Sequence, residues 1–535
     1  MSDPGAGSPG PGGRRGPRAA WSWILLALAL VVSAIVRVPL VRNARTHLDS
    51  DLAVDGLTLV ETTQGRWRWH FPGTPHIGTA PLAAMVPAAW VVGPTPLALG
   101  IAGLILNGST VVATYVLARR TCGPRVAAWS LLPMAFASTG AIWLSGRITG
   151  GHLLAVSWHA VAFTLLYVYL ARGGPIRALA MGLWCGLGLW VDSMFLMTLA
   201  GLIPAGIAAW FRSGRARRGL ISGLIFALGM AVGGLPAVAG RSVDPYDAYG
   251  DQFAPIWRAD VLLGHAKILA LDCLPRLIAG HRLPGLEADP GRIGPDGQAL
   301  PGTSRPGAVS VAVVSAGLGL FLIAVPGLAF DRRPVADLPG RAVRRGLLIS
   351  TTAVLAGFVL NRNIFNSDNY RYLVLLLVPW SLGLGRLLDR LSRKGQGGAA
   401  ASALVGAAFA ASFTLDAADW YRGLGWVDER RLPVERPLSD PMLEWLGTHP
   451  EAVSLYGGYW DVYRLSFLTR GRVRGIPSGH FPDRFPEWSH RLAGGHPTHA
   501  LARSTPVGLA IRRRVLQDRG TIQLEAEGGT LLAWP

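Results

Sequence analysis

Long apolar segments constrain this chain more than any other feature of its sequence. The first spans Trp21 to Val41, and about 20 apolar residues in a helix are enough to cross a bilayer. Further apolar runs lie at about 77–93, 97–118, 126–144, 151–171, 177–191, 194–211, 219–239, 309–329, 346–360, 371–388 and 398–415. Only 16% of the residues are charged, below the roughly 25% typical of soluble domains. We therefore expect a multi-pass α-helical membrane protein with about 11–12 membrane helices.

The N-terminal residues indicate how the chain is oriented in its membrane. Residues 1–20 are rich in Gly, Pro, Ser and Arg and have almost nothing to bury, so we expect a disordered tail. Its arginines, Arg14, Arg15 and Arg18, favour the cytoplasmic side. The first apolar run is long for a signal peptide and lacks a clear cleavage site, which indicates a retained anchor. The polar loop 42–76 is then expected on the outer face of the inner (plasma) membrane.

The formal net charge of +19 would suggest nucleic acid binding in a soluble chain. Here much of the excess lies in short loops between apolar runs, at Arg119–Arg120, Arg212–Arg218, Arg332–Arg345 and Arg390–Lys394. This is the positive-inside pattern, with contacts to anionic membrane lipids, so no nucleic acid partner is expected. The later basic loops place 240–308, 361–370 and the C-terminal residues outside. The number of crossings between 77 and 211 stays open.

The C-terminal residues 417–535 have a soluble composition, unlike the membrane domain expected over 21–416. Strand character occurs at 452–456, 472–476, 509–512 and 521–526, and helical character at 441–446 and 459–465. We therefore expect a small α/β domain outside the cell membrane. No Gly-rich phosphate loop follows a strand, which disfavours a nucleotide site. The three cysteines have no paired spacing and imply neither a zinc site nor a disulfide framework.

The outer loop 42–76 holds the first candidates for chemistry, Asp49 and Asp51. On an extended loop these two carboxylates would face one site. Two like charges that close raise one pKa and favour a bound cation or a general base. The alternative is a solvated loop in which both residues serve turns. Apolar positions from Asp51 to Gln64 predict a short helix on the membrane surface.

Two histidines, His70 and His76, lie where the chain re-enters the membrane. They could bind a metal ion or hydrogen-bond a sugar. The neighbouring Trp67 and Trp69 are also what an interfacial aromatic belt requires.

Basic and acidic residues at the edges of later apolar runs supply further candidates. Arg147 could hold a phosphate if its loop is outside, because its fork geometry suits that group. His152 and His159 are seven residues apart and so share a helix face that could line a cavity. Asp192 lies between two short apolar runs, where a carboxylate is either paired or lines a pathway.

The loop 361–372 is dense in amides, arginine and tyrosine. Its Arg362, Arg371 and Tyr372 are groups that recognise sugar hydroxyls and phosphates. The alternative is a polar turn between two helices.

Several of these stretches resemble the GT-C class of membrane glycosyltransferases, nearest the family 39, protein-mannosyltransferase and aminoarabinose-transferase-like branch. That branch often carries Asp-Ser-Asp-Glu-Ala-Val-x-Gly-Leu in its first outer loop, and residues 49–57 here read Asp-Ser-Asp-Leu-Ala-Val-Asp-Gly-Leu. A Gly before an aromatic stretch, a Gly-x-x-Tyr-x-Gly turn and an Arg-Tyr pair are also typical. They correspond to Gly65 with 67–71, to 73–78, and to Arg371-Tyr372.

The resemblance implies a GT-C-like helical bundle and a sugar donor linked to polyprenyl phosphate. Asp51 would act as general base, with Asp49 and Asp55 as candidates beside it, and the anomeric carbon would be inverted. Arg147, Arg362 or Arg371 would stabilise the departing lipid phosphate, and the acceptor would be a lipid, a glycan or a protein. Leu52 stands where the family commonly has Glu, and Ala80-Pro81 replaces a common acidic position. A divalent metal ion is therefore in doubt, and no other cofactor is implied.

Two alternatives remain at this point. A transporter or lipid-linked-sugar flippase would use groups at mid-membrane, such as Asp192, and would often show internal repeats. An inactive protein of the same fold is the other alternative, because Leu52 and Ala80 depart from the family pattern.

Overall fold

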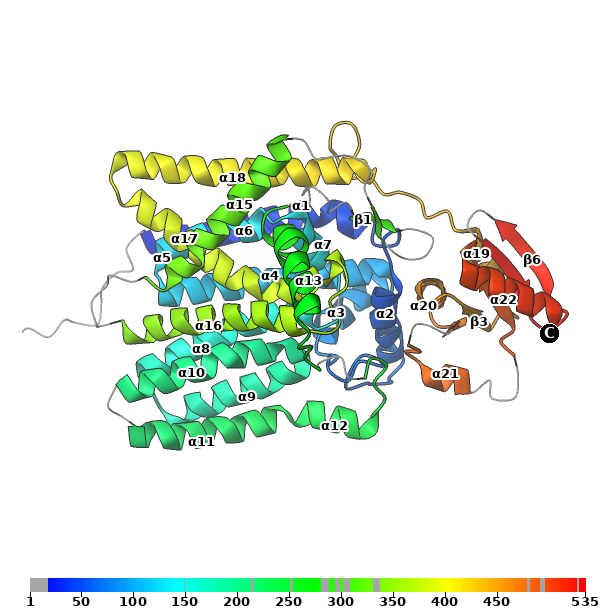
Figure 1. Ribbon diagram of the computed structural model, residues 1–535, viewed down its shortest axis with the longest axis horizontal. Coiled ribbons are helices and arrows are strands. Elements are labelled where there is room, and N and C mark those ends of the chain that lie inside the picture. The colour runs from blue at the N-terminus through cyan, green and yellow to red at the C-terminus, as the bar shows by residue number, and fades with distance from the viewer. Residues whose placement is uncertain are drawn as a thin grey trace, which may run out of the picture.

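The structure is a computed structural model that describes residues 18–148, 150–212, 216–250, 254–280, 288–293, 299–301, 308–330, 337–478, 482–490, 496–526 and 529–535. A body of long, roughly aligned helices forms one end of the molecule, and a smaller domain with the C-terminal strands forms the other (Figure 1). The disordered tail expected over 1–20 lies almost wholly outside the described residues.

The helical body contains α1 (Arg18–Arg42), α2 (Ser50–Thr63), α3 (Leu82–Val92), α4 (Pro96–Thr121), α5 (Pro124–Ser130), α6 (Leu132–Ala135), α7 (Thr139–Ser145), α8 (His152–Arg172), α9 (Pro175–Val191), α10 (Leu196–Arg212), α11 (Ala216–Gly233), α12 (Leu235–Val243), α13 (Ala259–Ile268), α14 (Leu274–Ile278), α15 (Ala308–Ala324), α16 (Leu338–Leu360), α17 (Leu377–Ser392) and α18 (Gln396–Gly423). Short helical turns η1 (Ser193–Phe195), η2 (Leu269–Cys273), η3 (Pro326–Leu328) and η4 (Ser367–Leu376) and a hairpin of β1 (Ala288–Ile293) and β2 (Ala299–Pro301) connect them. α18 continues past residue 416, where we expected the membrane domain to end.

The multi-pass helical class is confirmed. Within the described residues, nine helices are long and apolar enough to cross a membrane, or ten if the bent pair Pro124–Ala135 and Thr139–Ser145 is one span. The expected number was about 11–12. The difference comes from α3 and α9, which are apolar but shorter than the other spans. With 11 residues α3 reaches only about 16 Å, roughly half of a bilayer core.

Small residues let the membrane helices approach closely. A Cβ added at Gly182 in α9 would clash with the carbonyl oxygen of Phe226 in α11. One added at Gly201 in α10 would clash with the carbonyl oxygen of Gly346 in α16. Because apolar surface alone does not drive helices together in lipid, such tight backbone contacts stabilise the bundle.

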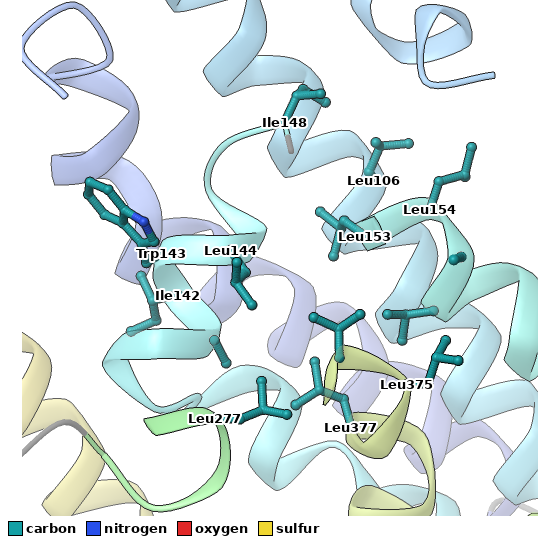
Figure 2. Close-up of a cluster of buried hydrophobic side chains, with 14 of the residues drawn as sticks. Leu106, Ile142, Trp143, Leu144, Ile148, Leu153, Leu154, Leu277, Leu375 and Leu377 are labelled. Carbon is teal, nitrogen blue, oxygen red and sulfur yellow. The ribbon is translucent and has the colours of Figure 1, made fainter. Parts of the chain in front are cut away.

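The hydrophobic core lies where several of these helices meet. Figure 2 shows part of this core, with labelled leucines of α4, α8, α14, η4 and α17 and with Ile142, Trp143 and Leu144 of α7. This packing fixes the ends of α7 and α8, and the loop between them carries Arg147.

The C-terminal domain is the expected α/β unit. It contains α19 (Pro441–Thr448), β3 (Ser454–Gly457), α20 (Tyr459–Leu468), β4 (Arg474–Pro477), α21 (Pro486–His490), β5 (His499–Ala502), α22 (Pro506–Gln517), β6 (Thr521–Ala526) and β7 (Gly529–Ala533). The strand order is β4-β3-β5-β7-β6, with β3 parallel to β4 and β5 and with β7 antiparallel to β5 and β6.

One predicted strand in this domain is wrong. Residues 509–512 lie inside helix α22. Thr505 caps the helix by accepting a hydrogen bond from the Gly508 N–H at 3.1 Å, and Pro506 occupies the first helical turn. The short apolar run at 509–512 is compatible with a strand or a helix. The N-cap and the proline before it favour the helix.

Helix α2 connects the two parts of the molecule. It lies across the end of the helical body and faces the C-terminal domain (Figure 1). α2 packs on α20 closely enough that a Cβ on Gly56 would lie 2.5 Å from the Phe467 ring. The acidic segment at the start of α2 and the C-terminal domain therefore form one continuous structure.

Candidate active site

The start of α2 is fixed by hydrogen bonds from both sides. Asp49 is the N-cap, and its carboxylate accepts a hydrogen bond from the Leu52 N–H at 2.8 Å. The buried Ser50 hydroxyl donates to the Tyr459 carbonyl oxygen at 2.6 Å, which ties α2 to α20. The expected short helix from Asp51 to Gln64 is confirmed as α2.

The two carboxylates do not face one site as expected from an extended loop. Asp51 is already in the first turn of α2, whereas Asp49 precedes the helix as its extended N-cap, so the two residues do not share an extended loop. Asp49 forms an ion pair with Arg147, whose guanidinium also lies 4.4 Å over the Trp143 ring. Asp51 points elsewhere. The capping role of Asp49 started the helix early enough to separate the pair.

Asp51 is surrounded by cationic and hydroxyl groups from distant segments. The Tyr459 hydroxyl donates to its Oδ1 at 2.7 Å. The Arg371 Nη1 lies 3.5 Å from Oδ2, and the Arg484 Nη1 lies 3.8 Å from Oδ1. Burial by itself would raise the pKa of Asp51, but the charges of Arg371 and Arg484 outweigh it and lower that pKa. The carboxylate is therefore ionised at neutral pH.

Arg484 reaches Asp51 from the C-terminal domain and is almost fully buried. Its Nε donates to the Pro72 carbonyl oxygen at 2.5 Å, and its Nη1 donates to the Tyr249 hydroxyl at 3.1 Å. Nη2 lies 3.4 Å from the Thr74 hydroxyl. The outer loop, the segment after α12 and the soluble domain thus share one guanidinium.

Asp55 lies one helical turn beyond Asp51 and is buried. Its Oδ2 accepts a hydrogen bond from the Gly150 N–H at 2.9 Å. Burial raises the pKa of Asp55 to about 8 in spite of that bond, and the negative charges of Asp51 and Asp49 act in the same direction. The site therefore combines an ionised carboxylate with one that holds a proton at neutral pH.

These groups open onto a cavity of about 420 Å³. The polar lining includes Asp51, Asp55, Thr74, His76, His152, Asp192, Tyr249, Asn361, Asn363, Arg371, Tyr372 and Arg484. The apolar lining includes Phe71, Met194, Leu196, Met197, Val354, Phe358, Leu360 and Phe365. One cavity thus offers both a charged end and an apolar wall.

Asp192 lies in this same cavity, at the end of α9. Its carboxylate caps η1 and accepts from the Met194 N–H at 2.8 Å, and it contacts the His152 Nδ1 at 2.6 Å. The loop between α2 and α3 is attached at this point, where the Ser193 N–H donates to the His76 carbonyl oxygen at 3.0 Å. Asp192 is therefore a paired group beside Asp51 and does not lie midway along a helix.

Other candidates lie outside the cavity lining. Arg147 is buried against Asp49. Arg362 is exposed, and His159 is buried with its Nδ1 2.8 Å from the Thr198 hydroxyl, so His159 does not line the cavity with His152. His70 contacts the Asp244 carbonyl oxygen at 2.9 Å, away from His76.

The donor set does not fit a metal centre. Among the described residues, no group of three or more His, Cys, Asp or Glu side chains could hold a metal ion. Asp51 instead faces two guanidinium groups, whose positive charge takes the place that a cation would need.

Sequence reasoning missed three residues of this site: Tyr249, Tyr459 and Arg484. Each lies in the segment after α12 or in the C-terminal domain, far along the chain from Asp51. Arg484 is one of 51 Lys and Arg residues, and no local motif distinguishes it from the others.

Comparison with known proteins gives a likeness at the level of structure. No protein-family model and no curated protein matches the chain. It is similar to the aminoarabinose transferase ArnT from Cupriavidus metallidurans, in the structure bound to undecaprenyl phosphate, with a TM-score of 0.59 and 12% identity. That alignment covers 97% of this chain and 98% of ArnT. The apo structure of ArnT gives a TM-score of 0.58 with 13% identity and the same coverage.

The archaeal oligosaccharyltransferase AglB from Archaeoglobus fulgidus, in complex with an inhibitory peptide and a dolichol-phosphate, is also similar, with a TM-score of 0.52 and 13% identity over 91% of this chain and 70% of AglB. At these identities the likeness is one of fold. The chain therefore has the fold of the GT-C membrane glycosyltransferases, as the resemblance in its outer loop predicted.

Proposed function

We propose that this protein is a membrane glycosyltransferase that moves a sugar from a polyprenyl-phosphate-linked donor to a hydroxyl of an extracytoplasmic acceptor, with inversion of the anomeric carbon. The observation that carries the proposal is the position of Asp51. Its ionised carboxylate lies between arginines of both domains, in a cavity that is lined by charged and by apolar side chains.

The two sides of the cavity match the two parts of such a donor. A prenyl chain would lie along Met194, Met197, Val354 and Phe358, where no hydrogen bonds are needed. The phosphate would lie at Arg371, with Arg484 behind it. Guanidinium groups suit phosphate oxygens because they donate two parallel hydrogen bonds.

The chemistry follows from this placement. The acceptor hydroxyl transfers its proton to the Asp51 carboxylate while its oxygen attacks the anomeric carbon. The bond from that carbon to the phosphate oxygen breaks, and the lipid phosphate leaves with the electron pair. Arg371 stabilises the charge that develops on the phosphate, which is the kind of preorganised electrostatic contribution that dominates many enzymes.

The arginines also set the protonation state of the base. In the resting site they keep Asp51 ionised. When a phosphate binds, it shares the positive charge of Arg371 with Asp51, and the pKa of the carboxylate rises toward a value suited to proton transfer. The protonated Asp55 would donate a hydrogen bond to a sugar hydroxyl.

Replacement of Asp51 by Asn tests the proposal. The variant should lose roughly 10²–10⁴-fold in transfer rate because it removes the base. In cells lacking the native protein, mass spectrometry should show accumulation of one polyprenyl-phosphate sugar that the native chain depletes.

Asp260→Asn is a matched control, because Asp260 is 66% exposed and outside the cavity. An unchanged donor pool in the Asp51→Asn strain, with normal amounts of protein in the membrane, would remove Asp51 from the mechanism. The same spectra identify the donor sugar.

The proposed orientation has its own test. Cys122, Cys185 and Cys273 are all buried, so introduced cysteines should dominate labelling by an impermeant maleimide. Gln523→Cys, exposed in the C-terminal domain, should label in intact cells. Gln396→Cys, exposed where α18 begins, should label only after lysis. The reverse pattern would place Asp51 on the cytoplasmic side and would exclude the proposed reaction outside.

A further inference from the structure

A second cavity, of about 520 Å³, lies at the other end of α2. It is formed by the C-terminal half of α2, the segment 64–70, the end of α12 and the parts of the soluble domain at 470–474 and 487–488. Glu61 lines it and is ten residues beyond Asp51, or about 15 Å along the helix. Asp51, Arg371 and Arg484 do not line it.

The carboxylates of this cavity converge on one arginine. Arg68 contacts Glu61 at 2.6 Å, Glu487 at 2.7 Å and Asp244 at 3.7 Å. The three acids come from α2, α21 and the segment after α12, so Arg68 joins three parts of the chain. This network leaves the acidic side of the cavity paired and rigid.

Three further arginines line the cavity without a carboxylate partner among the described residues. Arg66 contacts the Gln64 amide oxygen at 2.7 Å, and Arg470 and Arg474 are exposed. Arg470 has a φ of 54°, in the left-handed region that non-glycine residues seldom adopt. Such a conformation persists where its surroundings fix it, and here the end of α20 does so through the hydrogen bond from the Arg470 N–H to the Phe467 carbonyl oxygen.

Aromatic faces complete the lining. Trp67 is 53% exposed and Trp69 is 37% exposed, and their rings are 6.4 Å apart in an edge-to-face arrangement. Trp488 also lines the cavity, stacked on Phe485. Planar aromatic faces beside fixed polar groups suit the C–H face and the hydroxyl rim of a sugar ring. Arginines without partners suit a carboxylate or phosphate on that sugar.

We propose that this second cavity is a binding site for an anionic saccharide, one that carries a carboxylate or phosphate group. The saccharide lies against Trp67 and Trp69 with its anionic group at Arg470 and Arg474. The site is distinct from the catalytic cavity, because the two cavities share no lining residue. Binding here needs no sugar transfer, so the inference goes beyond the proposed function.

Saturation-transfer NMR on the full chain in nanodiscs tests the site, with trigalacturonic acid as the acidic probe and maltotriose as the neutral one. Trigalacturonic acid should bind, and Trp67→Ala should weaken that binding at least tenfold. Arg474→Gln should weaken the acidic probe several-fold and leave the neutral probe unchanged. Arg470→Asn removes the charge but tolerates the left-handed backbone, so it should weaken binding without unfolding the chain.

The controls separate this site from the catalytic one and from the membrane. Trp90→Ala removes a tryptophan that is 79% exposed and outside the cavity, and it should bind the probe normally. Asp51→Asn should also bind normally, even though it should slow transfer by the factor given above. No binding of either probe at 10 mM, or binding that Trp67→Ala and Arg474→Gln leave unchanged, would overturn the proposal. A different result would be retention of phosphatidylglycerol by the native chain and its loss from both Trp67→Ala and Arg474→Gln. That result would overturn the saccharide proposal and indicate a lipid headgroup site.

Discussion

The two cavities are built on one helix but use charge in opposite ways. At the start of α2, Asp51 is approached by arginines that face an open cavity with an apolar wall. At its far end, three acids are bound by the single arginine Arg68, and three other arginines remain available. A carboxylate that faces free space can take part in a reaction, whereas carboxylates held in a network mainly fix the geometry of their neighbours. The first cavity is thus suited to chemistry and the second to binding.

Among the variants that test this comparison, Arg484→Gln should have the largest effect on transfer. Loss of a preorganised cation should reduce transfer roughly 10²–10³-fold. Because Arg484 lowers the pKa of Asp51, its removal raises that pKa, and the base form is lost at a higher pH. The acidic limb of the pH–rate profile should therefore move to higher pH.

Arg484→Lys keeps the charge and should leave the acidic limb closer to that of the native chain. An unmoved limb in Arg484→Gln, with the native melting temperature, would show that this arginine does not act on Asp51.

A smaller effect is expected from Arg68→Gln in the second cavity. The variant leaves Glu61, Glu487 and Asp244 without their shared partner, and thermal unfolding in detergent should show a loss of about 2 kcal/mol. Transfer should fall much less than in Arg484→Gln.

The exposed pair of Arg512 and Glu525 provides the control for this prediction. Arg512→Gln should cost only about 0.5 kcal/mol, because solvent screens such pairs. An equal loss in both variants would mean that Arg68 is an ordinary surface arginine.

Asp55→Asn tests the protonation state of the second carboxylate in the first cavity. Burial raises the pKa of Asp55 to about 8 in the folded chain, above its ordinary value of 3.8. Between these values the folded state binds more protons than the unfolded state, so this residue makes stability fall as pH rises from about 4 to 8. Asp55→Asn should remove that dependence, so its melting temperature should exceed that of the native chain at pH 8 and match it near pH 4. Parallel curves for the two proteins at all pH values would contradict a protonated Asp55.

Local signals in the sequence predicted the parts of the site that local structure decides. The apolar period after Asp51 predicted α2, and the Arg371-Tyr372 pair, a substrate-binding candidate from the sequence, lies in the lining of the cavity. The separation of Asp49 from Asp51 was not predictable in the same way. The same residues could form an extended loop or, as in the structure, a helix start in which Asp49 accepts a hydrogen bond from the Leu52 N–H. The ion pair between Arg147 and Asp49 was also not predictable, since it joins residues 98 positions apart in the sequence.

The sequence by itself determined that this chain crosses a membrane many times, where α2 lies along the chain, and that a small α/β domain follows. These features depend on hydrophobic length, periodicity and capping, which act over a few neighbouring residues. Only the tertiary structure decided that Arg484 and Tyr459 meet Asp51, and that Arg68 gathers three acids. Such contacts depend on how α2 docks between the membrane helices and the soluble domain, and no single segment encodes that docking.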